Sequence, residues 1–207
     1  TKYIGGHGLS IGGLIIDGGN FDWEAAAKRF PMLNKPDPSY HGAVWTEAAK
    51  PLGPIAYILR ARVILLRDYG SAMSPFNAFT FIQGLETLPL RMQRHCENAE
   101  KVADYLDGHS KVEKVIYPKL MSGDHKDRAE RYMSGGFGSL LGFELKDGEG
   151  AGKKFIDNLK LLYHVANIGD ARSLAIHPAS TTHSQLSDDE KLSSGVTPGY
   201  VRLSIGI

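Results

Sequence analysis

The sequence has little cysteine, no long apolar run and almost no net charge. Cys96 is the only cysteine among 207 residues, which excludes an internal disulfide and favours a reducing, cytoplasmic setting. No apolar run approaches the roughly 20 residues that a bilayer crossing requires, and the first residues lack the basic and apolar parts of a signal peptide. With a net charge of +1, nothing electrostatic indicates a nucleic acid or a membrane surface as partner.

What is present is the composition of an ordinary globular protein. Hydrophobic residues make up 42% of the chain and charged residues 23%, which suits one large domain or two small ones. The chain opens at Thr1 and closes on the alternating apolar run YVRLSIGI. Because natural domains usually begin and end in polar linkers, we expect a fragment of a larger protein or one of two chains.

Residues 1–70 are expected to be the end of a larger α/β domain. LIIDGG, from residue 14, favours a short buried strand that ends in a turn, and FDWEAAAKRF a short helix capped by Asp22. Residues 31–54 contain five prolines and are expected to form a long irregular loop, which is more often functional than idle. A helical pattern then runs from residue 56 to Gly70.

The longest helical pattern lies between Ser74 and Gly108, and Pro89 inside it predicts a kink or two abutting helices. From about residue 109 the expected order is strand, strand, helix, strand, strand, which is typical of a small α/β domain with a mostly antiparallel sheet. The sequence thus predicts an α/β fold in three parts: the end of a large domain (1–70), a connecting helical segment (71–108) and a small C-terminal α/β domain (109–207).

Lys2, in the segment TKYIGGHG, is the first candidate for chemistry. A lysine near a terminus is usually solvated. A lysine that carries a cofactor as a Schiff base needs firmly held backbone and small neighbours, so that a planar ring can approach. The glycines after Lys2 meet this steric requirement, and Thr1 offers a hydroxyl to a phosphate.

Arg202 and Ser173 each allow an ordinary and a functional interpretation. An arginine in a strand usually faces solvent or pairs with an acid, but a planar guanidinium also suits the carboxylate of a substrate. A serine in a turn ordinarily bonds to the local backbone.

The other polar residues are interpreted as structural. No histidine has the spacing of a metal ligand, Cys96 suits a packed small residue, and the acidic run 188–190 suits a solvated loop or helix start. His7, His177 and His183 are interpreted either as structural or as residues that support the site from behind. Arg91 and Arg94 are interpreted as exposed or ion-paired.

TKYIGGHG resembles the lysine segment of the Cys/Met-metabolism enzymes that use pyridoxal 5'-phosphate (PLP). SPFNAFTFIQGLETLPLRMQRHCENA, NIGDARSLAIHPASTTHSQL and GYVRLSIGI agree in order, so the similarity covers essentially the whole chain. The resemblance implies the PLP-dependent transferase fold type I, similar to aspartate aminotransferase. It also implies Lys2 as the Schiff-base lysine and proton carrier, Thr1 as a phosphate contact, and Arg202 and Ser173 at the substrate α-carboxylate.

Part of the cofactor site is expected elsewhere. In the family, a phosphate loop, an aromatic residue stacked on the ring and an aspartate at the ring nitrogen all precede the lysine, and none can be mapped here. We therefore expect the N-terminal half of the enzyme as a separate chain. The resemblance further implies a homotetramer.

Two stretches favour the sulfhydrylase branch of the family: the proline-rich loop FPMLNKPDPSYHGAVWTEAAK and the phrase NIGDARSLAIHPASTTH. That branch implies a γ-replacement in which O-acetylhomoserine and sulfide or a small thiol give homocysteine or methionine and acetate. Relatives with the same residues catalyse other reactions. A methionine γ-lyase, a cystathionine γ-synthase or lyase, and a non-catalytic module therefore stay open.

Overall fold

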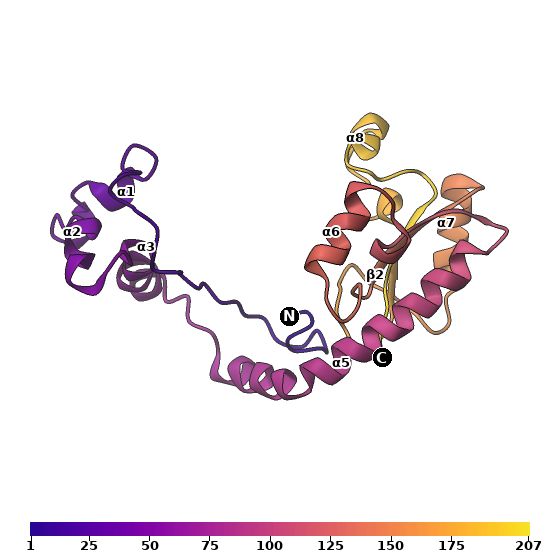
Figure 1. Ribbon diagram of the computed structural model, residues 1–207, viewed down its shortest axis with the longest axis horizontal. Coiled ribbons are helices and arrows are strands. Elements are labelled where there is room, and N and C mark those ends of the chain that lie inside the picture. The colour runs from indigo at the N-terminus through magenta and orange to yellow at the C-terminus, as the bar shows by residue number, and fades with distance from the viewer. The chain divides into compact units, whose positions relative to one another are not determined.

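The computed structural model describes residues 1–207 and divides into two compact units. Residues 12–78 form a helical unit, and residues 1–11 and 79–207 form an α/β unit (Figure 1). The three-part division inferred from the sequence stays a prediction.

The α/β unit is built on one five-stranded sheet, with strand order β1-β2-β5-β4-β3. Only β3 and β4 pair in parallel, so the expected mostly antiparallel sheet is confirmed. The strands are β1 (Val112–Ile116), β2 (Leu140–Leu145), β3 (Tyr163–His164), β4 (Leu174–Ile176) and β5 (Tyr200–Ser204). Its helical segments are α5 (Pro75–Asp107), η4 (Pro118–Leu120), α6 (Asp124–Tyr132), α7 (Gly148–Asp157), η5 (Pro178–Ser180) and α8 (Asp188–Ser193).

Helices α5 and α7 contribute to the core on one face of this sheet. Ala99 and Ala103 of α5 and Ile156 of α7 pack in the same cluster as Val201 and Leu203 of β5. Because side chains alternate along a strand, the intervening residue Arg202 lies on the opposite face. The strand pattern of β5 thereby separates a buried core from the face that carries a candidate functional residue.

Helix α5 is continuous through Pro89, so the alternative of two abutting helices is wrong. Figure 1 shows the helix curving along its length, as expected where a proline removes a backbone hydrogen bond. Helix α6 lies in the polar stretch 122–132, where the sequence pattern predicts no helix. Helix α8 begins at Asp188, so of the two interpretations of the acidic run 188–190 the helix start is confirmed.

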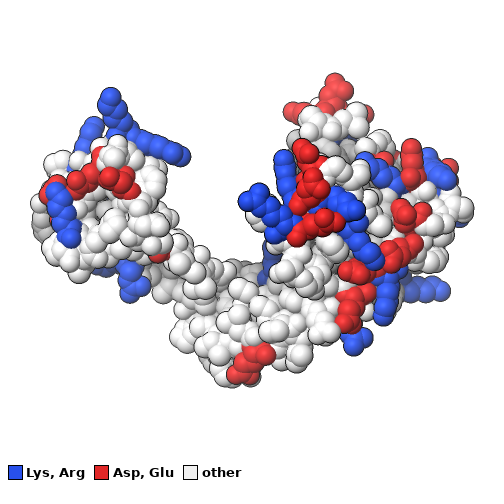
Figure 2. Space-filling model, viewed as in Figure 1, with Lys and Arg blue, Asp and Glu red and all other residues white.

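Charged side chains of both signs are interspersed over the surface of the α/β unit (Figure 2). Several form ion pairs within one helix, among them Lys153 with Glu149 at 2.6 Å and Arg94 with Glu97 at 3.6 Å. None of the helices in the chain combines the length and the apolar character that a bilayer crossing requires.

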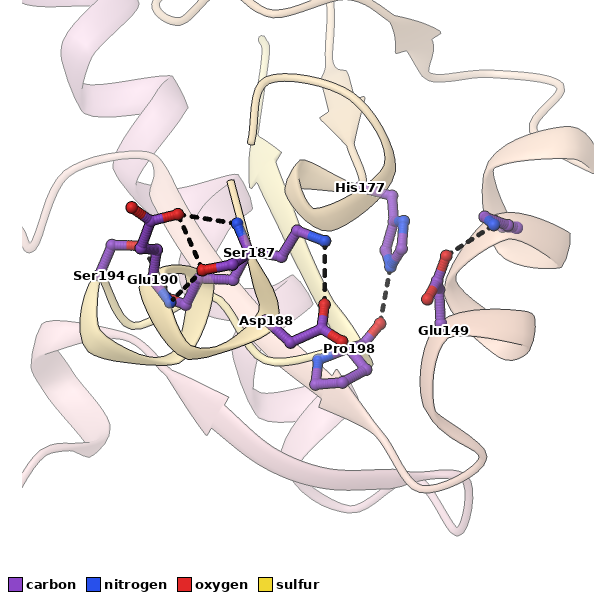
Figure 3. Close-up of polar contacts among 9 residues, drawn as sticks. Glu149, His177, Ser187, Asp188, Glu190, Ser194 and Pro198 are labelled. Carbon is purple, nitrogen blue, oxygen red and sulfur yellow. Dashed lines mark hydrogen bonds and ion pairs between the residues drawn. The ribbon is translucent and has the colours of Figure 1, made fainter. Parts of the chain in front are cut away.

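The segment before β5 is fixed by its own hydrogen bonds, and Figure 3 shows those between Ser187 and Glu190 and between His177 and Pro198. Ser187 and Glu190 form a capping box at the start of α8. His177, at 1% exposure, bonds through Nε2 to the carbonyl of Pro198 and through Nδ1 to the Ser180 hydroxyl, both at 2.8 Å. The interpretation of His177 as structural fits these contacts, which anchor the entry into β5.

The helical unit consists of short segments around a small core in which Trp45 is only 2% exposed. They are α1 (Pro31–Asn34), η1 (Pro38–Tyr40), α2 (Trp45–Ala49), η2 (Lys50–Leu52), α3 (Ala56–Arg60), the π-helix η3 (Ala61–Leu66) and α4 (Arg67–Tyr69). The helical run from residue 56 to Gly70 is confirmed. Residues 31–54, expected to be irregular, contain four of these segments.

Two expectations for this unit are wrong. LIIDGG forms no strand, and Leu14, Ile15 and Ile16 are largely exposed, because no strand of the chain lies beside them to pair with. Residues 21–30 form successive turns rather than a helix. Asp22 nevertheless accepts a hydrogen bond from the Ala25 N–H at 2.9 Å, as a cap would.

Asp37 is the polar centre of the helical unit. Its carboxylate accepts hydrogen bonds from the Ser39 hydroxyl (2.6 Å), the Trp45 indole N–H (2.8 Å) and Arg60 Nε (3.2 Å). The bonds from Ser39 and Trp45 are the main causes that lower the pKa of Asp37 from 3.8 to about 2, against the opposing effect of burial.

This pKa gives the helical unit an acid-sensitive stability. Since the folded pKa lies below the unfolded one, the stabilisation is present above about pH 4 and is lost as the pH falls toward 2. We expect Asp37→Asn to lower the melting temperature at pH 7 and to flatten its decline between pH 4 and pH 2. Fluorescence of the two tryptophans, both in this unit, reports the transition. Asp68→Asn, at an exposed carboxylate, is the control; an equal effect there would contradict the role of Asp37.

Candidate functional site

Asn167 joins the two strongest candidate residues, Lys2 and Arg202. The Lys2 amine donates to the side-chain oxygen Oδ1 of Asn167 at 2.8 Å, and Arg202 Nη2 donates to the Asn167 carbonyl at 3.4 Å. Lys2, at the beginning of the α/β unit, thus bonds to the side chain of Asn167, and Arg202, near its end, bonds to the backbone of the same residue. The amine of Lys2 is exposed, so it is open to a ligand.

The Arg202 guanidinium has donor capacity that this chain does not use. Its Nε is buried and has no hydrogen-bond partner. An unpaired buried donor costs free energy, which an anionic acceptor would recover. A carboxylate offers two oxygens in the geometry that a guanidinium matches. The orphaned Nε therefore suits an amino-acid carboxylate placed beside Lys2.

Three hydrogen bonds fix the loop 165–173 to the Lys2 segment and to the end of the chain. Gly169 N–H donates at 3.0 Å to the hydroxyl of Ser204, two residues after Arg202 on β5. Ala171 N–H donates to the Gly6 carbonyl at 2.8 Å, and Ile207 N–H donates to the Ala171 carbonyl at 2.9 Å. Asn167 is therefore held by both the Lys2 segment and the end of the chain.

Ser173 does not join this bridge. Its hydroxyl accepts a hydrogen bond from the Gly206 N–H at 2.9 Å, which ties the residue to the end of the last strand. A hydroxyl that accepts one bond keeps its own proton to donate. The structure therefore leaves a role at the carboxylate as a prediction. The same holds for Thr1, which is half-buried beside Lys2.

Asp170 and Arg172 form a charged pair at the tip of the loop. Asp170 is 4% exposed and accepts bonds from Arg172 Nε at 3.1 Å and Nη2 at 3.0 Å. Burial alone would raise the pKa of Asp170, but the hydrogen bonds from the Arg172 side chain and backbone outweigh it and lower the pKa. The carboxylate stays ionised and also accepts a bond from the Arg172 backbone N–H at 2.9 Å, which fixes this turn of the loop.

Arg91 is not the exposed or ion-paired residue that the sequence suggested. It is 7% exposed, and its Nη1 donates to the Tyr3 carbonyl at 2.8 Å. Its Nη2 donates to the carbonyls of Ile4 at 3.1 Å and Gly84 at 2.7 Å, and its Nε to the Thr87 hydroxyl at 3.1 Å. Arg91 therefore fastens the backbone directly after Lys2 to helix α5.

Gly84 allows this close approach. A Cβ atom at Gly84 would collide with the Ile4 carbonyl oxygen and would lie 3.0 Å from Gly5 Cα. The backbone of the Lys2 segment therefore lies directly on the surface of α5, where a larger residue could not be accommodated.

The next turns of α5 hold the end of the last strand. His95, fully buried, donates from Nδ1 to the Ile205 carbonyl at 2.6 Å, and Asn98 donates to the Gly206 carbonyl at 3.0 Å. Burial is the main cause that lowers the pKa of His95, so the imidazole is neutral at pH 7. The Tyr3 ring packs edge-on against it at 5.6 Å.

The sequence interpretation missed Asn167, Gly84 and Arg91. For α5 a signal was available: Gly84, Thr87, Arg91, His95 and Asn98 recur at intervals of three or four residues, which places them on one helical face. A glycine inside a helical pattern also points to a packing requirement. Nothing local distinguishes Asn167, whose importance arises from residues 165 and 35 positions away.

Comparison with known proteins identifies the relatives of this chain. A family model described as Cys/Met metabolism PLP-dependent enzyme matches residues 1–207. The chain belongs to this PLP-dependent family. The expectation drawn from TKYIGGHG and the three later stretches is thus confirmed.

Several relatives of this chain are named as sulfhydrylases. The O-acetyl-L-homoserine sulfhydrylase of Leptospira meyeri is 54% identical over 213 residues, covering 100% of this chain and 48% of that protein. O-acetyl-L-homoserine sulfhydrylase 1 of Thermus thermophilus is 51% identical over 207 residues, with the same coverage of each. The chain therefore spans about half the length of the curated relatives it matches.

A solved structure supports the mixed α/β fold. An O-acetylhomoserine (thiol)-lyase of Campylobacter jejuni, crystallised with N'-pyridoxyl-lysine-5'-monophosphate, matches with a TM-score of 0.85 and 39% identity. The match covers 99% of this chain and 48% of that one. In this chain, the exposed Lys2 amine, the neighbouring Thr1 hydroxyl and the unsatisfied Arg202 donor are chemically suited to PLP and to an amino acid bound to it.

The contact at Gly84 makes a prediction about stability. Alanine normally stabilises a helix interior relative to glycine by about 1 kcal/mol. At position 84 the added methyl would displace the Lys2 segment, and we expect Gly84→Ala to destabilise the α/β unit by about 1–3 kcal/mol. Thermal denaturation measures the change, and faster amide exchange at Gly6, whose N–H bonds to the Lys2 carbonyl, locates it.

Gly150→Ala is the matched control, because Gly150 lies in α7 and a Cβ there would meet no atom within 4 Å. It should be neutral or stabilising. Equal behaviour of the two variants would contradict the close packing of the Lys2 segment on α5.

Proposed function

We propose that this chain is the C-terminal part of an O-acetylhomoserine sulfhydrylase, with Lys2 as the residue that carries PLP. The reaction is a γ-replacement: the bond from Cγ to the acetyl oxygen breaks, acetate leaves with the electron pair, and sulfide or a small thiol forms the new C–S bond. Homocysteine or methionine results. The observation that carries the proposal is the Lys2–Asn167–Arg202 arrangement in a chain so similar to sulfhydrylases.

Lys2 has two roles in this proposal. Its amine holds the cofactor covalently, and once the substrate's amino group has taken its place, the freed amine moves protons between substrate carbons. PLP, when bound, supplies an electron sink conjugated to the substrate's amino group. Asn167 Oδ1 accepts a hydrogen bond from the amine at 2.8 Å and so defines where the amine stands. The Thr1 hydroxyl would contact the phosphate.

Arg202 and Ser173 would hold the α-carboxylate. The buried Nε of Arg202 has no partner, and the Ser173 hydroxyl can donate its proton while it accepts from Gly206. With the carboxylate fixed by Arg202, the substrate's α carbon would lie toward the Lys2 amine. This orientation leaves the substrate side chain free to react.

The proposal needs the rest of the enzyme. We propose that an N-terminal half, supplied as a separate chain, contributes the phosphate loop, the stacking aromatic residue and the aspartate at the ring nitrogen. Residues 1–70 would then complete a large domain of fold type I, followed by the connecting helix and the small domain. The assembly would be a cytoplasmic homotetramer.

The reaction and the role of Lys2 can be tested together. In the complete enzyme containing this chain, we expect O-acetylhomoserine and sulfide to give homocysteine and acetate. Borohydride reduction should add a pyridoxyl group to Lys2, detected by peptide mass. Lys2→Ala should lower kcat by about 10²–10⁴-fold, as expected for the loss of a proton-transfer group.

Other products would decide against the sulfhydrylase. Formation of 2-oxobutyrate from methionine alone, without homocysteine from the first mixture, would indicate a γ-lyase. Absence of any pyridoxyl group on Lys2 would indicate a non-catalytic module.

The carboxylate contact gives a second test. Arg202→Lys keeps the charge but loses the two-pronged geometry. Loss of a charge-assisted hydrogen bond costs about 1.5–3 kcal/mol, so we expect KM for O-acetylhomoserine to rise by roughly 10- to 100-fold. Arg131→Lys, on the exposed surface of α6, should leave KM unchanged. An unchanged KM in Arg202→Lys would remove Arg202 from the carboxylate site.

A further inference from the structure

One face of helix α5 contacts both segments that carry the candidate catalytic groups. Arg91 bonds to the carbonyls of Tyr3 and Ile4, directly after Lys2. One turn along, His95 bonds to the carbonyl of Ile205, and Asn98 then bonds to that of Gly206, shortly after Arg202. Because a helix is a rigid rod with a rise of about 1.5 Å per residue, this face fixes the spacing between the two segments.

Arg91 is unusual because all its hydrogen bonds within the chain go to neutral oxygens. No carboxylate pairs with it, although it is 7% exposed. A buried charge is stable only where its donors are satisfied, and here four bonds do so without an anion. Arginine has the forked geometry that reaches carbonyls on both sides; a lysine ammonium, a point charge on a flexible stem, does not.

The hydrogen bonds of Arg91 to the Tyr3 and Ile4 carbonyls act on Lys2 through the backbone. The carbonyls that Arg91 binds belong to the two residues after Lys2, and the Lys2 carbonyl itself accepts from Gly6 N–H at 2.8 Å. A Cβ at Gly6 would lie 2.5 Å from Arg91 Nη1, so the turn packs directly on the guanidinium. With the backbone fixed on both sides, the Lys2 side chain reaches Asn167.

We infer that Arg91 is a positioning residue, which sets the place of the Lys2 amine relative to Arg202 by clamping the Tyr3 and Ile4 carbonyls to helix α5. The inference rests on the proposed function, since it concerns the same lysine. Under this inference Arg91 touches neither substrate nor cofactor. Its effect on the reaction passes through the backbone of the Lys2 segment.

Arg91→Lys in the complete, PLP-loaded enzyme tests this inference. We expect kcat per bound cofactor to fall roughly 10- to 100-fold, because a misplacement of about 1 Å can cost that much. KM for O-acetylhomoserine should stay within about threefold, since the carboxylate contact at Arg202 is retained. Two readouts are independent of turnover: amide exchange at Gly6 should become faster, and the apo-protein should form the borohydride-trapped pyridoxyl-Lys2 more slowly.

Arg94→Lys is the matched control. Arg94 lies on the same helix, its side chain is 60% exposed and it pairs with Glu97, so all four quantities should equal those of the unchanged enzyme. Thr87→Val is a milder second variant, which removes the acceptor of Arg91 Nε and the longer bond (3.4 Å) from the Thr87 hydroxyl to the Gly84 carbonyl. It should change kcat, amide exchange and trapping in the same direction as Arg91→Lys but by less. It keeps the inference testable where Arg91→Lys does not fold.

The outcomes separate the inference from the proposed function. A folded Arg91→Lys enzyme with unchanged kcat, exchange and trapping would overturn the inference, because charge alone would then suffice. Lower stability with unchanged kcat per bound cofactor would also overturn it, as the mark of a merely structural residue. If the unchanged enzyme made no homocysteine, the proposed function would fail, while exchange and trapping would still decide the role of Arg91.

Discussion

The position of Lys2 depends on the hydrogen bonds that the Arg91 guanidinium makes to the backbone of residues 3 and 4. The dependence is mutual. Without those carbonyls Arg91 would be a buried charge short of acceptors, which costs several kcal/mol. Without Arg91 the short N-terminal segment would lose two of its hydrogen bonds to the rest of the unit. A segment of a few residues with many glycines gains its fixed conformation from such contacts rather than from its own propensities.

Helix α5 contains two residues that disfavour a helix, so its length depends on its packing against the rest of the α/β unit. Gly84 and Pro89 cost about 1 and 3 kcal/mol in a helix interior. The Lys2 segment lies against Gly84, and Ala99 and Ala103 are fully buried in the core of the α/β unit. Most helical stability in proteins comes from such tertiary contacts. The same glycine that weakens the helix creates the surface on which the candidate catalytic segment lies.

Elements with a clear hydrophobic period could be predicted from the sequence, and those held by distant contacts could not. β1 and β5 follow from alternation, β2 from a short apolar run, and α7 and α5 from helical spacing. α6 and α8 are polar, with only Ala129 buried between them, so they lack an apolar period. Leu14–Ile16 have a strand-like composition but no partner strand. Lys2 and Arg202 emerged from the family resemblance, whereas Arg91 and Asn167 acquire their roles only through contacts with residues far away in the sequence.

In the proposed function, Lys2 and Arg202 constrain one end of an amino acid and leave the other free. A guanidinium on the carboxylate and an amine at the α carbon suit any amino acid bound to the cofactor, so these two residues serve replacement and elimination equally. Asn167, which bonds to both residues, would lie at this end as well. The choice between sulfide, another thiol or no nucleophile concerns the γ carbon, several bonds away. Under the proposed function, the groups that make this choice contact the substrate side chain, and neither Lys2 nor Arg202 is among them.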